Sequence, residues 1–239
     1  NVLKLKEQGI HFIGPNKGEM ACGEVGYGKM ASVQEIKKEI DYLLKPGILT
    51  GKRALVTSGP TIEQIDPVRF ISNNSSGKQG HAIADALRRH GADTNLISGP
   101  VNIKDPENVK VTKVNSAEEM LHECRESLPV DIAVFAAAVS DWRCSNTSNI
   151  KIKKTSENDE LNLNLEKNQD ILKEISTLNK NRPDLVIGFS LETDNLIETA
   201  KEKLKNKSCD WIVANGHYNG KESVFDSDMN SVKLVENDN

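Results

Sequence analysis

The sequence lacks the features that mark several large classes of protein. Its four cysteines, Cys22, Cys124, Cys144 and Cys209, lie far apart and form no Cys-x-x-Cys pair, so we expect neither a disulfide framework nor a zinc site. The longest uninterrupted apolar run, residues 132–139, is far shorter than a membrane span. A formal net charge of −4 without a long basic run argues against a nucleic-acid surface. We therefore expect the partners to be small molecules.

The N-terminus also lacks the apolar core of a signal peptide, which favours a cytoplasmic protein in a reducing compartment. A chain of 239 residues suffices for one large domain, or for one domain plus a fragment of another. Because the chain begins with Asn1 rather than methionine, we expect a fragment of a longer chain, with a processed terminus as the alternative.

The stretch NNSSGKQG, residues 73–80, looks like a nucleotide-binding loop but lacks two residues of the P-loop. That motif, Gly-x-x-x-x-Gly-Lys-Ser/Thr, directs backbone N–H groups at phosphate and holds magnesium through its hydroxyl. Here Ser72 stands in place of the first glycine, and Gln79 stands in place of the hydroxyl residue. The stretch therefore needs another explanation.

Two regions with different patterns follow one another along the chain. Residues 1–30 are glycine-rich and leave little room for a helix or a regular strand, so we expect a loop or flap. Ser32 and Glu35 have the spacing of a capping box, and the helical pattern after them ends at a proline-glycine pair. We therefore predict one domain over residues 1–46 and another over residues 47–239.

From residue 51 onward, short apolar runs alternate with helical patterns. We expect strands at residues 54–56, 95–97, 109–111, 131–139, 185–189 and 211–213, a strand pair near 224–235, and helices at 77–90, after the capping box of Ser116 and Glu119, and at 195–207. This alternation predicts an α/β fold, Rossmann-like, with a mainly parallel sheet and helices on both faces. Its ligand crevice should lie beyond the carboxyl ends of the strands.

The connection between the first of these strands and the helix at 77–90 is long. A dinucleotide-binding turn would pass directly from strand to helix, whereas about twenty residues intervene here. Their polar, non-repetitive composition favours an ordered functional loop, with a surface excursion as the alternative. Ser75 or Ser76 can cap the helix, while Gly77 and Gly80 let a ligand approach its N-terminus. We expect an anion site there.

Position alone makes an aspartate and two pairs of lysines candidates for ligand binding. Asp141 follows a strand and should project into the crevice, where a carboxylate can bind a ribose hydroxyl, a base amine or magnesium; a helix cap or turn role is equally compatible. Lys151 and Lys153 should share one side of an extended segment, and Lys203 and Lys207 should share one helix face. Solvated surface lysines, or lysines that offset a helix dipole, would show the same spacing.

Three further side chains are less informative. Cys22 lies among glycines, where an exposed thiol can act as an acid or a nucleophile, but no histidine near it in the sequence supports a cysteine–histidine hydrolase. Trp142 and Trp211 each lie beside a strand end, and we expect both to pack rather than to stack on a cofactor.

Six separated motifs resemble those of phosphopantothenoylcysteine synthetase in order, spacing and content. They are GPT at 59–61, DPVRFISNNSSGKQG at 66–80, FAAAVSDWR at 135–143, KIKK at 151–154, GFSLET at 188–193 and KLKNKSCDWIVAN at 203–215. The preceding GPNKGEMACGEVGYGKM resembles the C-terminal flap of phosphopantothenoylcysteine decarboxylase, which bacteria fuse ahead of the synthetase. The resemblance implies the back portion of such a bifunctional protein of coenzyme A biosynthesis.

The resemblance also implies an activity and site residues. The family joins phosphopantothenate to the amino group of L-cysteine, and the bacterial fused forms use CTP through an acyl-cytidylate, releasing pyrophosphate and then CMP. By resemblance, Asp141 binds the nucleotide with Mg²⁺, Lys151 serves formation of the cytidylate, and Arg69 and Asn73 act on the acyl intermediate, with Asn73 as the main residue of the second step. The other CTP-binding positions are Phe135, Ala136, Ala137, Asn168, Gln169, Asp170, Ile171, Phe189, Lys203 and Lys207.

The family further suggests a homodimer through the synthetase domain. Cys22 matches the decarboxylase cysteine that acts on a flavin-derived intermediate, but FMN belongs to the decarboxylase domain that this chain lacks, so we do not expect decarboxylation from it alone. The chain departs from the family pattern at Gln169, which replaces proline, and at Ser140 and Ser190-Leu191, which replace alanines; it also ends before the usual C-terminal helix. An ATP-using ligase and a non-catalytic nucleotide-binding or assembly module stay open as alternatives.

Overall fold

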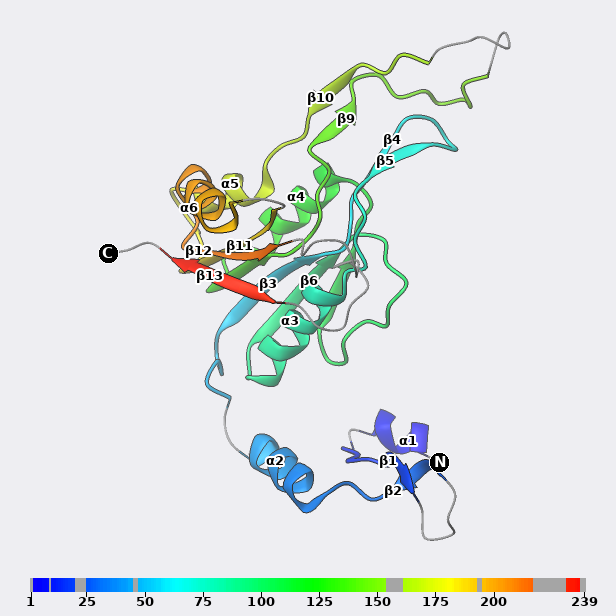
Figure 1. Ribbon diagram of the computed structural model, residues 1–239, viewed down its shortest axis with the longest axis vertical. Coiled ribbons are helices and arrows are strands. Elements are labelled where there is room, and N and C mark those ends of the chain that lie inside the picture. Colours follow the sequence, from blue (N-terminus) through cyan, green and yellow to red (C-terminus); the bar gives the residue numbers. More distant parts are fainter. Residues whose placement is uncertain are drawn as a thin grey trace. The chain divides into compact units, whose positions relative to one another are not determined.

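Figure 1 shows the computed structural model of the chain, which describes residues 2–8, 10–19, 25–44, 47–153, 161–192, 195–216 and 231–236. The chain divides into two compact units, residues 1–48 and residues 49–239, and each is described by itself. Within the described ranges, no helix is both long and apolar enough to cross a membrane.

The first unit contains a short helix and a hairpin where the sequence predicted an irregular flap. Helix α1 spans Val2–Glu7, and strand β1 (Asn16–Glu19) pairs antiparallel with β2 (Val25–Lys29). The expectation for residues 1–30 was therefore wrong. Antiparallel pairing uses backbone N–H and C=O groups, and glycine supplies both.

Helix α2, Val33–Leu44, begins at the predicted capping box. The backbone N–H of Ser32 donates to the Glu35 carboxylate at 2.7 Å, and the N–H of Glu35 donates to the Ser32 hydroxyl at 3.3 Å. Two N–H groups at the helix start are thus satisfied reciprocally. The assignment of this unit to a decarboxylase stays a prediction.

The second unit is built on a seven-stranded sheet whose strands are parallel except at one edge. In spatial order, the strands are β13 (Val232–Glu236), β12 (Trp211–Gly216), β11 (Leu185–Glu192), β8 (Ile132–Phe135), β3 (Arg53–Ser58), β6 (Asp93–Ser98) and β7 (Lys110–Lys113). Only β13 runs antiparallel, against β12. The predicted α/β, Rossmann-like fold is confirmed.

Helices cover both faces of this sheet, as its near-continuous apolar strands require. They are α3 (Lys78–Arg89), α4 (Ala117–Glu126), α5 (Ile171–Ser176) and α6 (Leu196–Lys207). Leu55 of β3 packs in the core cluster that contains Met120 of α4, whereas the next residue, Val56, packs with Ala84 of α3. Adjacent residues of one strand therefore fill the cores of opposite faces.

Two hairpins extend from the sheet and form what we call the arm, defined as residues 62–72, 142–153 and 161–167 (Figure 1). One pairs β4 (Ile62–Gln64) with β5 (Phe70–Ser72), and the other pairs β9 (Trp142–Cys144) with β10 (Leu165–Lys167). The backbone N–H of Ser148 joins them by donating to the Ile65 carbonyl at 3.0 Å. The long connection after β3 is thus ordered.

Three local expectations were wrong. Strand β8 ends at Phe135 rather than at residue 139. Beyond Phe135 the chain runs beside residues 57–60 and makes only isolated backbone hydrogen bonds to them, such as Ala138 N–H to the Gly59 carbonyl at 2.9 Å. The N-cap of α3 is Gly77, in the left-handed conformation, and neither Ser75 nor Ser76 caps the helix. Residues 151–153 form no strand, so the alternation expected for Lys151 and Lys153 does not apply.

The predicted strand pair near 224–235 lies partly outside the described residues. Its described portion contributes to β13 at the sheet edge.

Candidate functional site

Two adjoining pockets open at the carboxyl ends of the parallel strands, where the fold predicts a ligand crevice. The first pocket, of about 500 Å³, is lined by Thr57, Phe135, Ala137, Val139, Ser140, Asp141, Trp142, Lys167, Asn168, Gln169, Asp170, Ile171, Leu172, Phe189, Lys203 and Lys207. The second, of about 1040 Å³, is lined by residues 73–80 together with Ala82, Ile83, Ala86, Ile103, Ala136, Ala137, Ala138, Val139, Asp141, Phe189, Leu191, Lys203 and Asn215. The shared wall consists of Ala137, Val139, Asp141, Phe189 and Lys203.

Nearly all of the predicted nucleotide-binding residues gather in the first pocket. Of the twelve, Ala136 lines only the second pocket and Lys151 lines neither. The segment 168–170 is held in place by backbone contacts: Asn168 donates from Nδ2 to the Ser140 carbonyl at 2.8 Å and from its backbone N–H to the Asp141 carbonyl at 2.9 Å. The loop therefore stays anchored although Gln169 replaces the proline of the family pattern.

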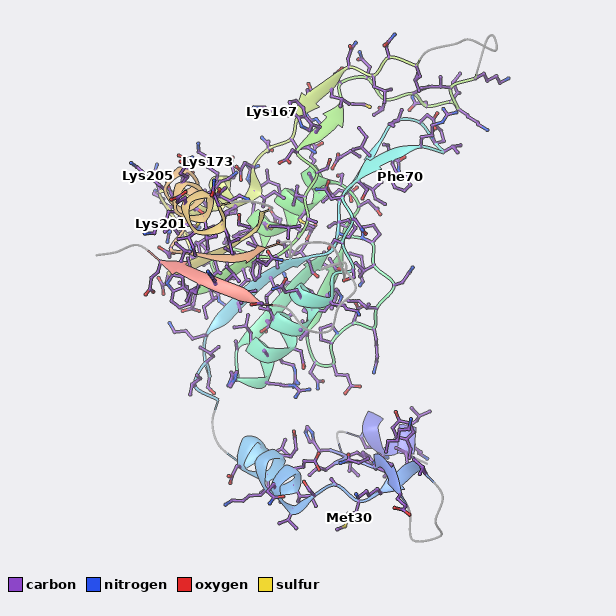
Figure 2. The ribbon with its side chains drawn as sticks, viewed as in Figure 1. Met30, Phe70, Lys167, Lys173, Lys201 and Lys205 are labelled. Carbon is purple, nitrogen blue, oxygen red and sulfur yellow. The ribbon has the colours of Figure 1, made fainter. Side chains whose placement is uncertain are left out.

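Helix α5 and helix α6 meet at the far side of the first pocket. Asp170 caps α5 by accepting from the Lys173 N–H at 3.1 Å, and its second oxygen pairs with Lys207. One turn earlier on α6, Lys203 Nζ lies 3.2 Å from the Ser190 hydroxyl. Ser190, which replaces an alanine of the family pattern, therefore contacts the predicted nucleotide-binding residue Lys203. Both lysines line the pocket, whereas Lys201 and Lys205 are exposed (Figure 2). The shared helix face predicted from spacing is confirmed.

Asn73 lies in the second pocket, at the base of the stretch that precedes α3. Its Nδ2 donates to the Val139 carbonyl at 2.9 Å and makes a long contact of 3.5 Å to the Ala138 carbonyl. Gly77, with φ 73°, adopts a left-handed conformation that disfavours a side chain at this turn. The Ser58 hydroxyl at the end of β3 donates to the Gly77 carbonyl at 2.9 Å, which fixes the start of α3.

A buried histidine supports this turn, and sequence reasoning missed it. His81 Nδ1 lies 2.9 Å from Ser58 Oγ and 3.1 Å from the Gly77 carbonyl, while Nε2 lies 3.5 Å from an Asp105 oxygen. Burial lowers the pKa of His81 below its ordinary value of 6.5, and the nearby Lys113 acts in the same direction. The contacts join residues far apart in sequence, so no local motif indicates them.

Trp142 and Lys167 were also missed as site residues. We expected Trp142 to pack rather than to stack on a cofactor, but its side chain is 45% exposed and lines the first pocket. Lys167, its cross-strand partner, lies with Nζ 5.8 Å from the centre of the indole ring, a cation–π distance. Figure 2 shows Lys167 where β10 leaves the arm.

Two predicted catalytic residues lie on the arm rather than among the residues that line the pockets. Arg69 forms an ion pair with Asp66 at 2.6 Å, and Lys151 is exposed next to Ile152. Cys22 lies outside the described residues. Cys124, Cys144 and Cys209 are buried free thiols, and burial raises the pKa of Cys209 to about 11, which disfavours the reactive thiolate.

Comparison with known proteins decides the family. The model of the DNA/pantothenate metabolism flavoprotein C-terminal domain matches residues 49–239. The chain belongs to this family. A relative named coenzyme A biosynthesis bifunctional protein CoaBC, from Haemophilus influenzae, is 42% identical over 236 residues, covering 98% of this chain and 58% of the relative.

Another relative carries a different name. A cysteine/cysteine sulfinic acid decarboxylase from an unknown prokaryotic organism is 41% identical, over 98% of this chain and 69% of the relative. The crystal structure of the C-terminal domain of a coenzyme A biosynthesis bifunctional protein CoaBC superposes with a TM-score of 0.65 at 37% identity, covering 80% of this chain and 85% of that one. The chain thus spans little more than half of the bifunctional relative, so its own activity must be argued from the site.

Proposed function

We propose that the chain joins phosphopantothenate to L-cysteine, using CTP to form an acyl-cytidylate and releasing pyrophosphate and CMP. The observation that carries this proposal is the wall shared by the two pockets, which contains Asp141 and Lys203. A ligase of this type must hold a nucleotide and an acid so that the α-phosphate meets the carboxylate. Two pockets that meet along one charged wall provide such an arrangement.

In the first step, a carboxylate oxygen of phosphopantothenate attacks the α-phosphorus of CTP, and the bond to the pyrophosphate oxygen breaks. Lys203 and Lys207 line the first pocket and would neutralise the charge that shifts onto pyrophosphate. Among the described residues, no group of three or more His, Cys, Asp or Glu side chains could hold a metal ion by itself. Mg²⁺ does not need such a group, because it commonly binds one or two carboxylates together with substrate phosphates. Asp141 fits that role, and the ion would supply further charge neutralisation.

In the second step, the unprotonated cysteine amine attacks the acyl carbon, the bond from that carbon to the phosphate oxygen breaks, and CMP leaves while the nitrogen loses a proton to solvent. Asn73 is held by its bond to the Val139 carbonyl, while the contact to Ala138 is too long to engage its other hydrogen strongly. We propose that this hydrogen donates to the acyl oxygen as that oxygen gains charge. An amide does so without offering a competing nucleophile.

We further propose that a second copy of the chain supplies Lys151 and Arg69. Both lie on the arm, and neither lines a pocket. The arm also exposes a set of apolar side chains that a partner would cover, namely Val68, Phe70, Ile150, Leu161, Leu163 and Leu165. Mixing Lys151→Gln chains with Asn73→Asp chains should then restore product formation, because one hybrid site combines intact Lys151 with intact Asn73. Inactive mixtures would contradict supply by a partner.

The nucleotide is tested by measuring pyrophosphate release with CTP and with ATP under identical conditions. We expect faster turnover with CTP. Equal or faster turnover with ATP would replace the CTP assignment with an ATP-using ligase, and binding of either nucleotide without turnover would favour a non-catalytic module.

A further inference from the structure

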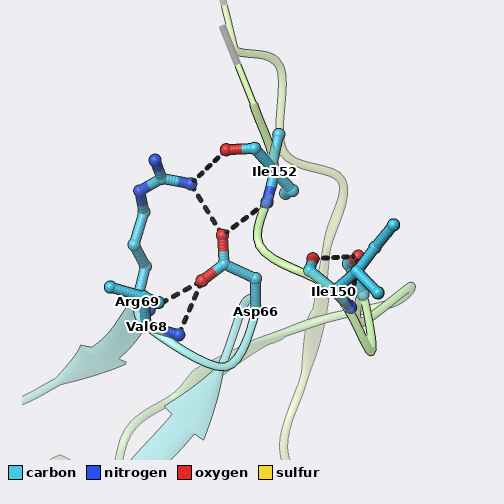
Figure 3. A network of polar contacts seen from close by, with 6 residues as sticks. Asp66, Val68, Arg69, Ile150 and Ile152 are labelled. Atoms are coloured by element: carbon cyan, nitrogen blue, oxygen red, sulfur yellow. Dashed lines mark hydrogen bonds and ion pairs between the residues drawn. The ribbon is translucent and has the colours of Figure 1, made fainter.

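Asp66 is a buried carboxylate on the arm. It begins the motif at residues 66–80, but no role has been given to it so far. Its side chain is fully enclosed, and Figure 3 shows its contacts. One oxygen accepts the backbone N–H groups of Val68 and Arg69 at 2.8 and 2.9 Å. The other accepts Arg69 Nη1 at 2.6 Å and the backbone N–H of Ile152 at 3.1 Å.

The two carboxylate oxygens of Asp66 stabilise different parts of the arm. The contacts to Val68 and Arg69 N–H close the turn between β4 and β5, as an aspartate at a turn often does. The contact to Ile152 crosses to the segment that carries Lys151, and Arg69 Nη1 completes it by donating to the Ile152 carbonyl at 3.3 Å. Both backbone polar groups of Ile152 are therefore held by the Asp66–Arg69 pair.

The segment around Lys151 needs such an anchor because residues 150–153 belong to no described helix or strand. A second attachment is at Ser148, whose backbone N–H donates to the Ile65 carbonyl at 3.0 Å. Lys151 thus lies between two tethers to the β4–β5 hairpin, one at Ser148 and one at Ile152. Removing the second would free the backbone next to the lysine.

The Asp66 carboxylate is also kept charged. Burial alone raises its pKa, but the backbone N–H groups of Val68, Ile152 and Arg69 and the Arg69 charge outweigh that influence, so the pKa lies below its ordinary value. A charged acceptor forms stronger hydrogen bonds than a neutral one. The anchor is therefore present throughout the neutral pH range.

We propose that Asp66 is a positioning residue that places Lys151 for formation of the acyl-cytidylate, and that it orients Arg69 with the same carboxylate. The inference rests on the proposed role of Lys151. Displacement of a reacting group by about 1 Å can reduce a rate by roughly 100-fold. Loss of the anchor should therefore slow pyrophosphate release by about that factor.

Asp66→Asn separates the two functions of the carboxylate. The amide oxygen can still accept the turn N–H groups of Val68 and Arg69, whereas the amide NH₂ would face two donors, Ile152 N–H and Arg69 Nη1. The matched control is Asp85→Asn, because Asp85 also pairs with arginines, at 3.0 Å from Arg88 and 2.7 Å from Arg89, but lines neither pocket. We expect Asp66→Asn to slow pyrophosphate release about 100-fold and Asp85→Asn to leave it unchanged.

A double-mutant cycle with Lys151→Gln tests whether Asp66 acts through the lysine. If it does, Asp66→Asn causes no further loss in the Lys151→Gln background, and backbone hydrogen exchange across residues 148–153 speeds up in Asp66→Asn. Equal losses in both backgrounds, or unchanged exchange, would overturn the positioning role. Undiminished release by Lys151→Gln itself would instead refute the proposed role of Lys151, and the inference with it.

Discussion

Gly99 offers a sharp test of how the sheet supports the pockets. It follows β6, and a Cβ added there would lie 1.7 Å from the Pro60 carbonyl oxygen and 2.9 Å from the carbonyl carbon. Its φ lies outside the left-handed range, so the obstacle to alanine is contact rather than backbone conformation. To reach an ordinary contact of 3.4 Å, the carbonyl would have to retreat by about 1.7 Å.

That movement would reach the pockets. Pro60 bridges to Ala138, and the next residue, Thr61, accepts the backbone N–H of Ser140 at 2.9 Å through its hydroxyl. Between these two contacts lies Val139, whose carbonyl anchors Asn73. A substitution at Gly99, which lines neither pocket, is therefore expected to displace the shared wall.

Overpacking typically costs about 1–3 kcal/mol, and a clash with backbone puts Gly99→Ala at or above the upper end of that range. For a domain of this size, about 3 kcal/mol corresponds to a drop in melting temperature of roughly 6–12 °C. The control is Gly51→Ala, where no atom lies within 4 Å but φ is 83°, so only backbone strain of roughly 1–2 kcal/mol applies. Thermal unfolding and ligase assays below both melting temperatures should show loss of activity for Gly99→Ala alone. Similar melting and similar activity of the two variants would refute this reasoning.

Three further outcomes are expected. Asn73→Asp should accumulate the acyl-cytidylate, detectable by mass spectrometry, and normal product formation would count against its role in the second step. Lys203→Gln should raise the KM for CTP by about tenfold, as loss of a charge-assisted hydrogen bond predicts, and an unchanged KM would remove it from the nucleotide site. Burial lowers the pKa of His81 in the folded chain, and Lys113 acts in the same direction, so near that pKa the unfolded chain binds more protons than the folded chain. The free energy of unfolding should therefore fall as the pH drops from about 7.5 to 5.5, and His81→Gln should weaken this dependence; an equal pH dependence in both proteins would contradict it.

Much of the fold could be predicted because its signals are local. Ser116, for example, caps α4 by accepting the Glu119 N–H at 3.1 Å, as the capping-box spacing indicated. Asp141 was placed in the crevice because parallel strands end at the same edge of a sheet, and both pockets confirm that placement. The spacing of Lys203 and Lys207 likewise set their shared helix face.

What could not be predicted depends on contacts between distant segments. No local pattern connects Asp66 with Ile152, or His81 with Ser58, because each pair meets only after the chain has folded. The exposure of Trp142 was missed for a related reason: whether an aromatic residue beside a strand end packs or lines a pocket depends on the hairpin partner that reaches it.

We propose above that the two pockets together make an amide between phosphopantothenate and cysteine. The most direct test of this proposal is to incubate the chain with phosphopantothenate, L-cysteine, CTP and Mg²⁺ and to analyse the products by mass spectrometry. We expect phosphopantothenoylcysteine together with equal amounts of CMP and pyrophosphate. Binding of CTP without formation of the amide would contradict it.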